Sequence, residues 1–150
     1  MKKDKKKLWG IPKGGGKKYE NILETSIREF KEETGIEPKG PYIELGKVIH
    51  SSGKIVYAFA FEGEYDGKLN CTSFAKVRTN TGEMIEIPEV DEGEMFTKEE
   101  SKQCINPAQF EFIERLELIF KERSKISDKS ISERNISSID NNVDNNVNNK

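Results

Sequence analysis

The sequence has few of the residues that build disulfides, thiolate metal sites or histidine-based catalytic sites: of its 150 residues, two are cysteine, one is histidine and one is tryptophan. Cys71 and Cys104 lack the close spacing of a zinc site, and we expect both to be reduced thiols. There is no apolar run of membrane-spanning length and no signal-peptide pattern, so we expect a soluble, cytoplasmic protein. The net charge of −2 gives no general attraction to nucleic acid.

The composition predicts one domain with two unstructured ends. Charged residues make up 35% of the chain and hydrophobic residues 33%, which allows only a modest core. Residues 1–8 are mainly basic, and residues 124–150 are rich in serine, asparagine and aspartate without aromatic residues. Such segments bury too little apolar surface to offset the entropy of ordering them. We therefore expect a folded domain at 9–123 between disordered ends.

Residues 21–35 have the pattern of a helix with an acidic face. Asn21 is a good N-cap, Glu24 completes a capping-box pattern, and Gly35 is a stop signal. At about 3.6 residues per turn, three acids fall within roughly 100° of arc beside the apolar face: Glu29, Glu32 and Glu33. Glu33 lies nearest the apolar edge, so we expect it to be the most buried of the three.

Three carboxylates on one arc repel one another unless positive charge lies among them. Arg28 is spaced to form ion pairs with Glu32, four residues later, and with Glu24, four residues earlier. Carboxylate oxygens on a rigid helix also suit Mg²⁺, with Mn²⁺ as the alternative ion. A solvated acidic face is the simpler alternative, but it does not account for the glycine loop that precedes the helix.

That loop, residues 13–18, reads Lys-Gly-Gly-Gly-Lys-Lys. Glycine permits a ligand to approach the backbone closely, and successive N–H groups in such a loop form a concavity that binds anions. We therefore expect Lys13 and the backbone around Gly15 to bind substrate phosphate. An ordinary flexible turn is the alternative, since glycine and lysine are common in turns.

Read with its gaps, the stretch 14–36 is Gly, five residues, Glu, seven residues, Arg-Glu-Phe, one residue, Glu-Glu, one residue, Gly-Ile. It resembles the Nudix box, the signature of hydrolases that cleave nucleoside diphosphates linked to another group, and every fixed position is filled. The likeness runs from about Trp9 to Leu116, through ELGKV, SGKIVYAFAFEGEYD, PEVDEGEMF and INPAQ. Over that range the chain is similar to a bacterial subgroup described as predicted nucleoside-triphosphate pyrophosphohydrolases.

The resemblance implies an enzyme that acts on acid anhydrides in phosphorus-containing compounds. The reaction would be Mg²⁺-dependent hydrolysis of a phosphoanhydride in a nucleoside triphosphate or a substrate like a dinucleoside polyphosphate. Arg28 would orient the glutamates and Glu20 would support the site. The implied metal ligands are Glu29, Glu32, Glu33 and the Gly14 carbonyl. The alternative is a catalytically inactive or truncated Nudix-like module that binds nucleotide without turnover.

Two positions outside the box are less well determined. The resemblance implies a further catalytic or metal-binding carboxylate in the loop PEVDEGEMF, and spacing back from Met95 favours Glu89, with Glu86 as the alternate. Either Glu32 or Glu89 would accept the proton of the attacking water. Trp9 either packs beneath the glycine loop or lines a pocket for the base.

We expect an α+β fold, the Nudix α/β/α sandwich with a mixed β-sheet. Alternating apolar residues on both faces of 54–64 suggest a central strand covered on both sides. Further strands are expected at 42–51, 73–78 and 83–87. Capping signals at Thr97 and at Asn106-Pro107 predict two helices.

The resemblance also implies two or more strands before Trp9, but only eight residues precede it in this sequence. We therefore expect a sandwich that is shortened at its N-terminal side. A late start, a truncated gene, or a gap filled by another segment or subunit would each explain this. An exposed sheet edge at that point would favour self-association.

Overall fold

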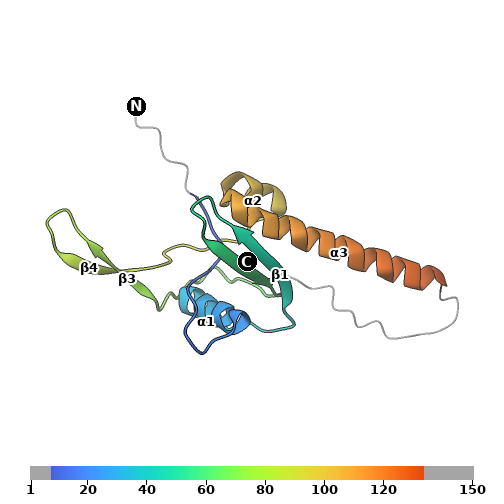
Figure 1. Ribbon diagram of the computed structural model, residues 1–150, viewed down its shortest axis with the longest axis horizontal. Helices are drawn as coiled ribbons and strands as arrows, with labels where there is room; N and C mark the ends of the chain where they lie inside the picture. Colours follow the sequence, from blue (N-terminus) through green and yellow to red (C-terminus); the bar gives the residue numbers. More distant parts are fainter. Residues whose placement is uncertain (1–7, 134–150) are drawn as a thin grey trace.

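The computed structural model describes residues 8–133, with side chains through residue 127, so residues 1–7 of the expected basic segment and residues 134–150 lie outside the described residues. One helix is followed by a run of four strands and then by two helices, which confirms the α+β class. The elements are α1 (Ile22–Thr34), β1 (Ile43–Ile49), β2 (Ile55–Ala60), β3 (Phe74–Arg78), β4 (Met84–Pro88), α2 (Lys98–Cys104) and α3 (Pro107–Glu133) (Figure 1).

The described strands form two separate two-stranded antiparallel sheets, β1–β2 and β3–β4. This differs from the single mixed sheet that we expected, because each hairpin pairs only within itself. The one parallel pairing among residues 8–133 is an isolated bridge between Trp9 and Ile105. The β3–β4 hairpin, called the arm below, projects away from the rest of the molecule (Figure 1).

The core lies between the β1–β2 sheet and α3. Val48 pairs with Val56 across the sheet, and both are buried against the apolar stripe of α3, which includes Phe112 and Leu116. The apolar stripe of α3 therefore packs inward. Helix α1 lies on the opposite side of this sheet (Figure 1), so the domain keeps a helix, sheet, helix order around β1–β2.

Strand β2 is covered fully on one face only, contrary to our expectation. Val56, Ala58 and Ala60 are buried, whereas Ile55 and Tyr57 on the other face are 49% and 42% exposed. Helix α1 reaches the sheet beyond the end of β2, where Phe30 packs edge-on against Phe61 with ring centroids 5.1 Å apart. Helix α1 therefore covers this face of β2 only in part.

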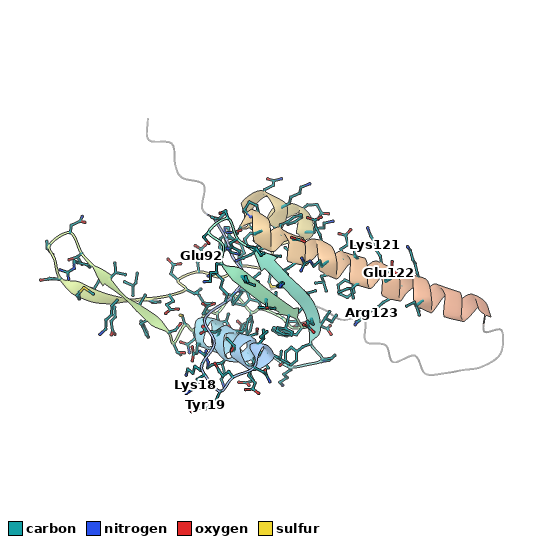
Figure 2. The ribbon with its side chains drawn as sticks, viewed as in Figure 1. Lys18, Tyr19, Glu92, Lys121, Glu122 and Arg123 are labelled. Atoms are coloured by element: carbon teal, nitrogen blue, oxygen red, sulfur yellow. The ribbon has the colours of Figure 1, made fainter. Side chains whose placement is uncertain are left out.

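Helix α3 continues past the expected domain boundary. We predicted a disordered tail from residue 124, but the helix runs to Glu133. The ion pair between Lys121 and Glu117, 2.8 Å and four residues apart, supports the helix in the part that extends beyond the sheet, and Lys121, Glu122 and Arg123 project from that part (Figure 2). Over the part of the chain that the structure describes, no helix is both long and apolar enough to cross a membrane.

Candidate active site

Helix α1 begins and ends where the sequence predicted. The N–H of Glu24 donates to Asn21 Oδ1 over 2.8 Å, and the left-handed Gly35, with φ of 75°, donates its N–H to Lys31 O. Two of the three acids on the predicted arc are buried, Glu33 at 6% exposure and Glu29 at 8%. Glu33 is therefore the most buried of the three, as predicted.

Arg28 joins the carboxylates of this helix to the glycine loop. Its Nη1 donates to Glu29 at 2.9 Å and to Glu32 at 3.1 Å, while Nη2 donates to the Gly15 carbonyl at 2.9 Å. Nε and Nη2 also bind both oxygens of Glu20, at 2.7 and 3.0 Å. The Arg28 guanidinium holds the pKa of Glu20 down to about 2, mainly through these hydrogen bonds.

Arg28 forms an ion pair with Glu20 and not with Glu24, the partner that we predicted. The predicted pair with Glu32 forms, but the side chain of Glu24 instead accepts a hydrogen bond from the Asn21 amide at 2.9 Å. The glycine loop folds back along α1 and brings Glu20 beside the guanidinium. Helical spacing alone therefore gave one of the two ion pairs correctly.

Gly14 lies directly against the carboxylate of Glu29. A Cβ at Gly14 would stand 1.9 Å from Glu29 Cδ, closer than any non-bonded contact allows. A Cβ at Gly15 would meet nothing within 4 Å. Position 14 therefore requires glycine, whereas position 15 has room for a side chain. Lys18 and Tyr19 lie at the outer end of this loop, before α1 begins (Figure 2).

Glu33 connects the helix to the residue before the glycines. Its Oε2 accepts the backbone N–H of Lys13 at 2.9 Å. The pKa of the Glu33 carboxyl is raised to about 7, mainly by burial and also by the nearby negative charges of Glu29 and Glu89, while the Lys13 N–H opposes the shift. Glu33 is thus a buried carboxyl surrounded by like charge, which a cation would relieve.

A pocket of about 360 Å³ opens beside Glu33. Its wall includes the predicted site residues Trp9, Lys13 and Glu89. Trp9 meets Phe96 edge-on with centroids 4.9 Å apart, so one end of the pocket is aromatic. The Trp9 ring thus lines a pocket, as one of the two expectations had it, while its packing partner is Phe96; that the pocket takes a base stays a prediction. Glu92, another lining residue, lies between the base of the arm and the β1–β2 sheet (Figure 2).

The structure separates the two candidate acids outside the helix. Glu89 follows the end of β4, lines the pocket, and is held by its N–H, which donates to Ser73 O at 3.0 Å. Glu86 lies in the middle of the arm, opposite Lys76 in the neighbouring strand. Glu89 is therefore the acid that lies near Glu33.

A divalent cation fits the donors at this site. Among the described residues, no three acid, histidine or cysteine side chains converge into a ready-made metal cluster. Arg28 accounts for part of this, because its guanidinium bonds to both Glu29 and Glu32. The donors are nevertheless the carboxylate oxygens that Mg²⁺ prefers, and the close approach of Gly14 leaves its backbone beside them.

Sequence reasoning missed Gln109, which is only 1% exposed and accepts the N–H of Ile11 at 2.9 Å. The sequence did carry a signal for this residue. Gln109 lies three, four and seven residues before Phe112, Ile113 and Leu116 of the α3 stripe. This helical spacing places a polar residue on the buried face of the helix. The pocket residues Phe96 and Tyr65 carried no comparable signal, because they lie in irregular segments.

Taken together, these features define a class of protein: a small α+β domain that presents helix-borne carboxylates and a glycine loop to a partly aromatic pocket, as suits an enzyme acting on phosphate compounds. The model of the NUDIX domain matches residues 2–116, and the chain belongs to the Nudix family. Membership implies hydrolysis of nucleoside diphosphate-linked substrates. Comparisons with curated proteins and with solved structures gave no match.

Proposed function

We propose that the protein is a Mg²⁺-dependent hydrolase that cleaves a phosphoanhydride bond in a nucleoside triphosphate or a substrate like a dinucleoside polyphosphate. One observation carries the proposal: the pocket that takes in Trp9 and Lys13 also reaches Glu33 and Glu89. A volume of about 360 Å³ suits one nucleoside better than a large substrate. The partner would be a small phosphorylated nucleotide in the cytoplasm, with neither nucleic acid nor membrane involved.

Each group has a role in this proposal. Lys13, at the pocket wall, would neutralise substrate phosphate, and the backbone N–H groups around Gly15 would bind its oxygens. The aromatic pair of Trp9 and Phe96 would contact the base. The metal ligands would be the Gly14 carbonyl and four carboxylates, those of Glu29, Glu32, Glu33 and Glu89. When bound, Mg²⁺ would neutralise charge on the phosphate oxygens and lower the pKa of a coordinated water.

The general base would be Glu89 or Glu32, each of which can accept a proton from water as a carboxylate. Glu89 lines the pocket, whereas Glu32 accepts a hydrogen bond from Arg28 at 3.1 Å. This contact favours Glu89 as the base and Glu32 as a metal ligand. Both acids are also proposed metal ligands, so each is replaced by glutamine and kcat is compared at saturating Mg²⁺, where loss of the base should lower kcat more than loss of a ligand.

The test is a substrate screen with purified protein, in Mg²⁺ and in EDTA, over nucleoside triphosphates, dinucleoside polyphosphates, nucleotide sugars and diphosphoinositol polyphosphates. Glu32→Gln is the test variant. Glu37→Gln is the matched control, because Glu37 is an exposed acid just past the helix that pairs with Lys31 away from the pocket. We expect Mg²⁺-dependent product release by the wild type and the control, but not by Glu32→Gln.

The screen also separates the enzyme from the binding module that the sequence left as an alternative. If folded wild type releases no more product than Glu32→Gln on any substrate, the hydrolase proposal fails. Nucleotide binding measured by calorimetry, without turnover, would then identify a binding module.

A further inference from the structure

Residues 9–13, called the strap below, run from the α2–α3 junction to the glycine loop. At one end, Trp9 donates its N–H to Cys104 O at 2.8 Å and accepts the N–H of Asn106 at 3.0 Å. At the other end, the Lys13 N–H donates to Glu33 at 2.9 Å. The strap therefore spans from the last two helices to the acidic helix α1.

Gln109 holds the middle of the strap. It lies in the first turn of α3, is buried to 1% exposure, and uses Oε1 to accept the Ile11 N–H across 98 positions of sequence. A buried amide of this kind is retained at low cost only when its polar atoms are bonded. Gly10 permits the approach, since a Cβ there would stand 3.3 Å from Gln109 Oε1.

The three contacts use every second N–H of the strap, those of Trp9, Ile11 and Lys13. The chain bends at residue 12, between the last two of these N–H groups, so that they reach different helices, α3 and α1, over a short span of backbone. The position of the Ile11 N–H thus bears directly on that of Lys13, two residues later. Lys13 in turn contacts Glu33 and lines the pocket.

We propose that Gln109 is a positioning residue, which sets the place of Lys13 and the glycine loop against Glu33 from the far side of the domain. Its role in catalysis rests on the hydrolase function proposed above. Its role in placing the strap does not, because that depends only on the contacts of Ile11 and Lys13.

The test compares three variants. Gln109→Met keeps the length of the side chain and removes the acceptor, and Gln109→Glu restores an oxygen acceptor at the same reach. Arg115→Met is the matched control: Arg115 lies on the same helix and binds the Leu45 and Lys47 carbonyls of β1, each at 2.8 Å, without touching the strap. The readouts are amide hydrogen exchange at Lys13, Tm, and KM against kcat.

We expect Gln109→Met to speed exchange at Lys13 by at least about tenfold and to raise KM by a similar factor, with Gln109→Glu nearer the wild type. Arg115→Met should lower the Tm without changing exchange at Lys13 relative to other amides. The proposal is overturned if Gln109→Met leaves Lys13 exchange unchanged, or if Arg115→Met alters it equally. If the wild type shows no turnover, the hydrolase proposal fails, and exchange at Lys13 still decides the role of Gln109.

Discussion

The backbone N–H of Lys13 donates to the Glu33 carboxylate over 2.9 Å, and this contact joins the start of the glycine loop to the acidic helix. Glu33 is otherwise buried among like charges. The loop therefore places a fixed N–H dipole against Glu33, the most buried acid of the helix. Changes on either side of the contact should affect both stability and activity.

Glu33 should make the protein less stable as pH rises. Its folded pKa of about 7 lies above the ordinary value of 4.5, so the folded state holds an extra proton between these values. By linkage, the free energy of unfolding is highest, for this group, below pH 4.5, and falls as pH rises through about 7. Glu33→Gln should remove this fall, which is on the order of 3 kcal/mol.

Urea unfolding of the wild type and Glu33→Gln in EDTA at pH 5 and pH 8 measures the effect. EDTA is needed because a bound cation would favour the ionised carboxylate and hide the shift. Glutamine keeps an oxygen for the Lys13 N–H, so the comparison changes charge more than contacts. Parallel stability curves for the two proteins would show that burial does not raise this pKa.

The two glycines before α1 should differ sharply in tolerance. Gly14→Ala places a methyl group where the Glu29 carboxylate lies, 1.9 Å from Cδ, so Glu29 must move away from its present position. A displacement of about 1 Å can cost roughly 100-fold in rate, and we expect such a loss in kcat/KM. Gly15→Ala meets nothing within 4 Å and should stay within about threefold of the wild type, since the role proposed for Gly15 uses only backbone N–H groups. Equal losses of kcat/KM in the two variants would show that the close contact between Gly14 and Glu29 is not needed for activity.

Arg28→Lys should impair the site although it keeps the positive charge. The guanidinium binds Glu20, Glu29, Glu32 and the Gly15 carbonyl together, and a lysine ammonium has too few donors in the wrong geometry to do so. We expect kcat/KM to fall at least about tenfold. The pKa of Glu20, now about 2, should rise toward its ordinary value.

Steady-state kinetics and carboxyl ¹³C titration of Glu20 measure the two effects. Arg123→Lys is the control, because Arg123 is exposed on the outer part of α3. An unchanged Glu20 titration in Arg28→Lys would mean that hydrogen bonding by the guanidinium does not set that pKa.

Features that depend on local chemistry were predictable from the sequence. The caps of α1 at Asn21 and Gly35 and the capping box at Thr97 rest on residues within one turn of each helix end, and all three form. The burial order of Glu33 and Glu29 followed from helical spacing alone. These features need no knowledge of the rest of the chain.

Features that depend on distant contacts were not predictable. The aromatic end of the pocket joins Trp9 to Phe96, and the strap joins Ile11 to Gln109, and neither pairing has a local pattern. Strand β2 carried apolar residues on both faces, which suggested full burial, yet Ile55 and Tyr57 stay exposed. Periodicity gives the faces of a strand but not what packs on them.

One face of the arm exposes apolar side chains to solvent. Ala75, Val77, Ile85 and Ile87 share one face of β3–β4, where Val77 pairs with Ile85, while the other face is mixed. It carries Lys76, Arg78 and Glu86 together with Phe74 and Met84. A two-stranded hairpin alone in water is marginally stable, and neither outer edge of the arm pairs with another described strand. We propose that two arms pack face to face, which would bury both apolar faces and leave the mixed faces in water.

Val77→Glu with Ile85→Lys tests this proposal. The two residues are cross-strand partners, so the opposite charges keep the hairpin paired while they make its face polar. Light scattering should show the mass of the wild type rising above that of one chain, 17.1 kDa, with concentration, while the double variant stays at one chain. Leu118→Lys, at a residue 59% exposed on α3, is the control and should associate like the wild type. A wild type that remains one chain at all concentrations, or a double variant that associates equally, would exclude the arm as the interface.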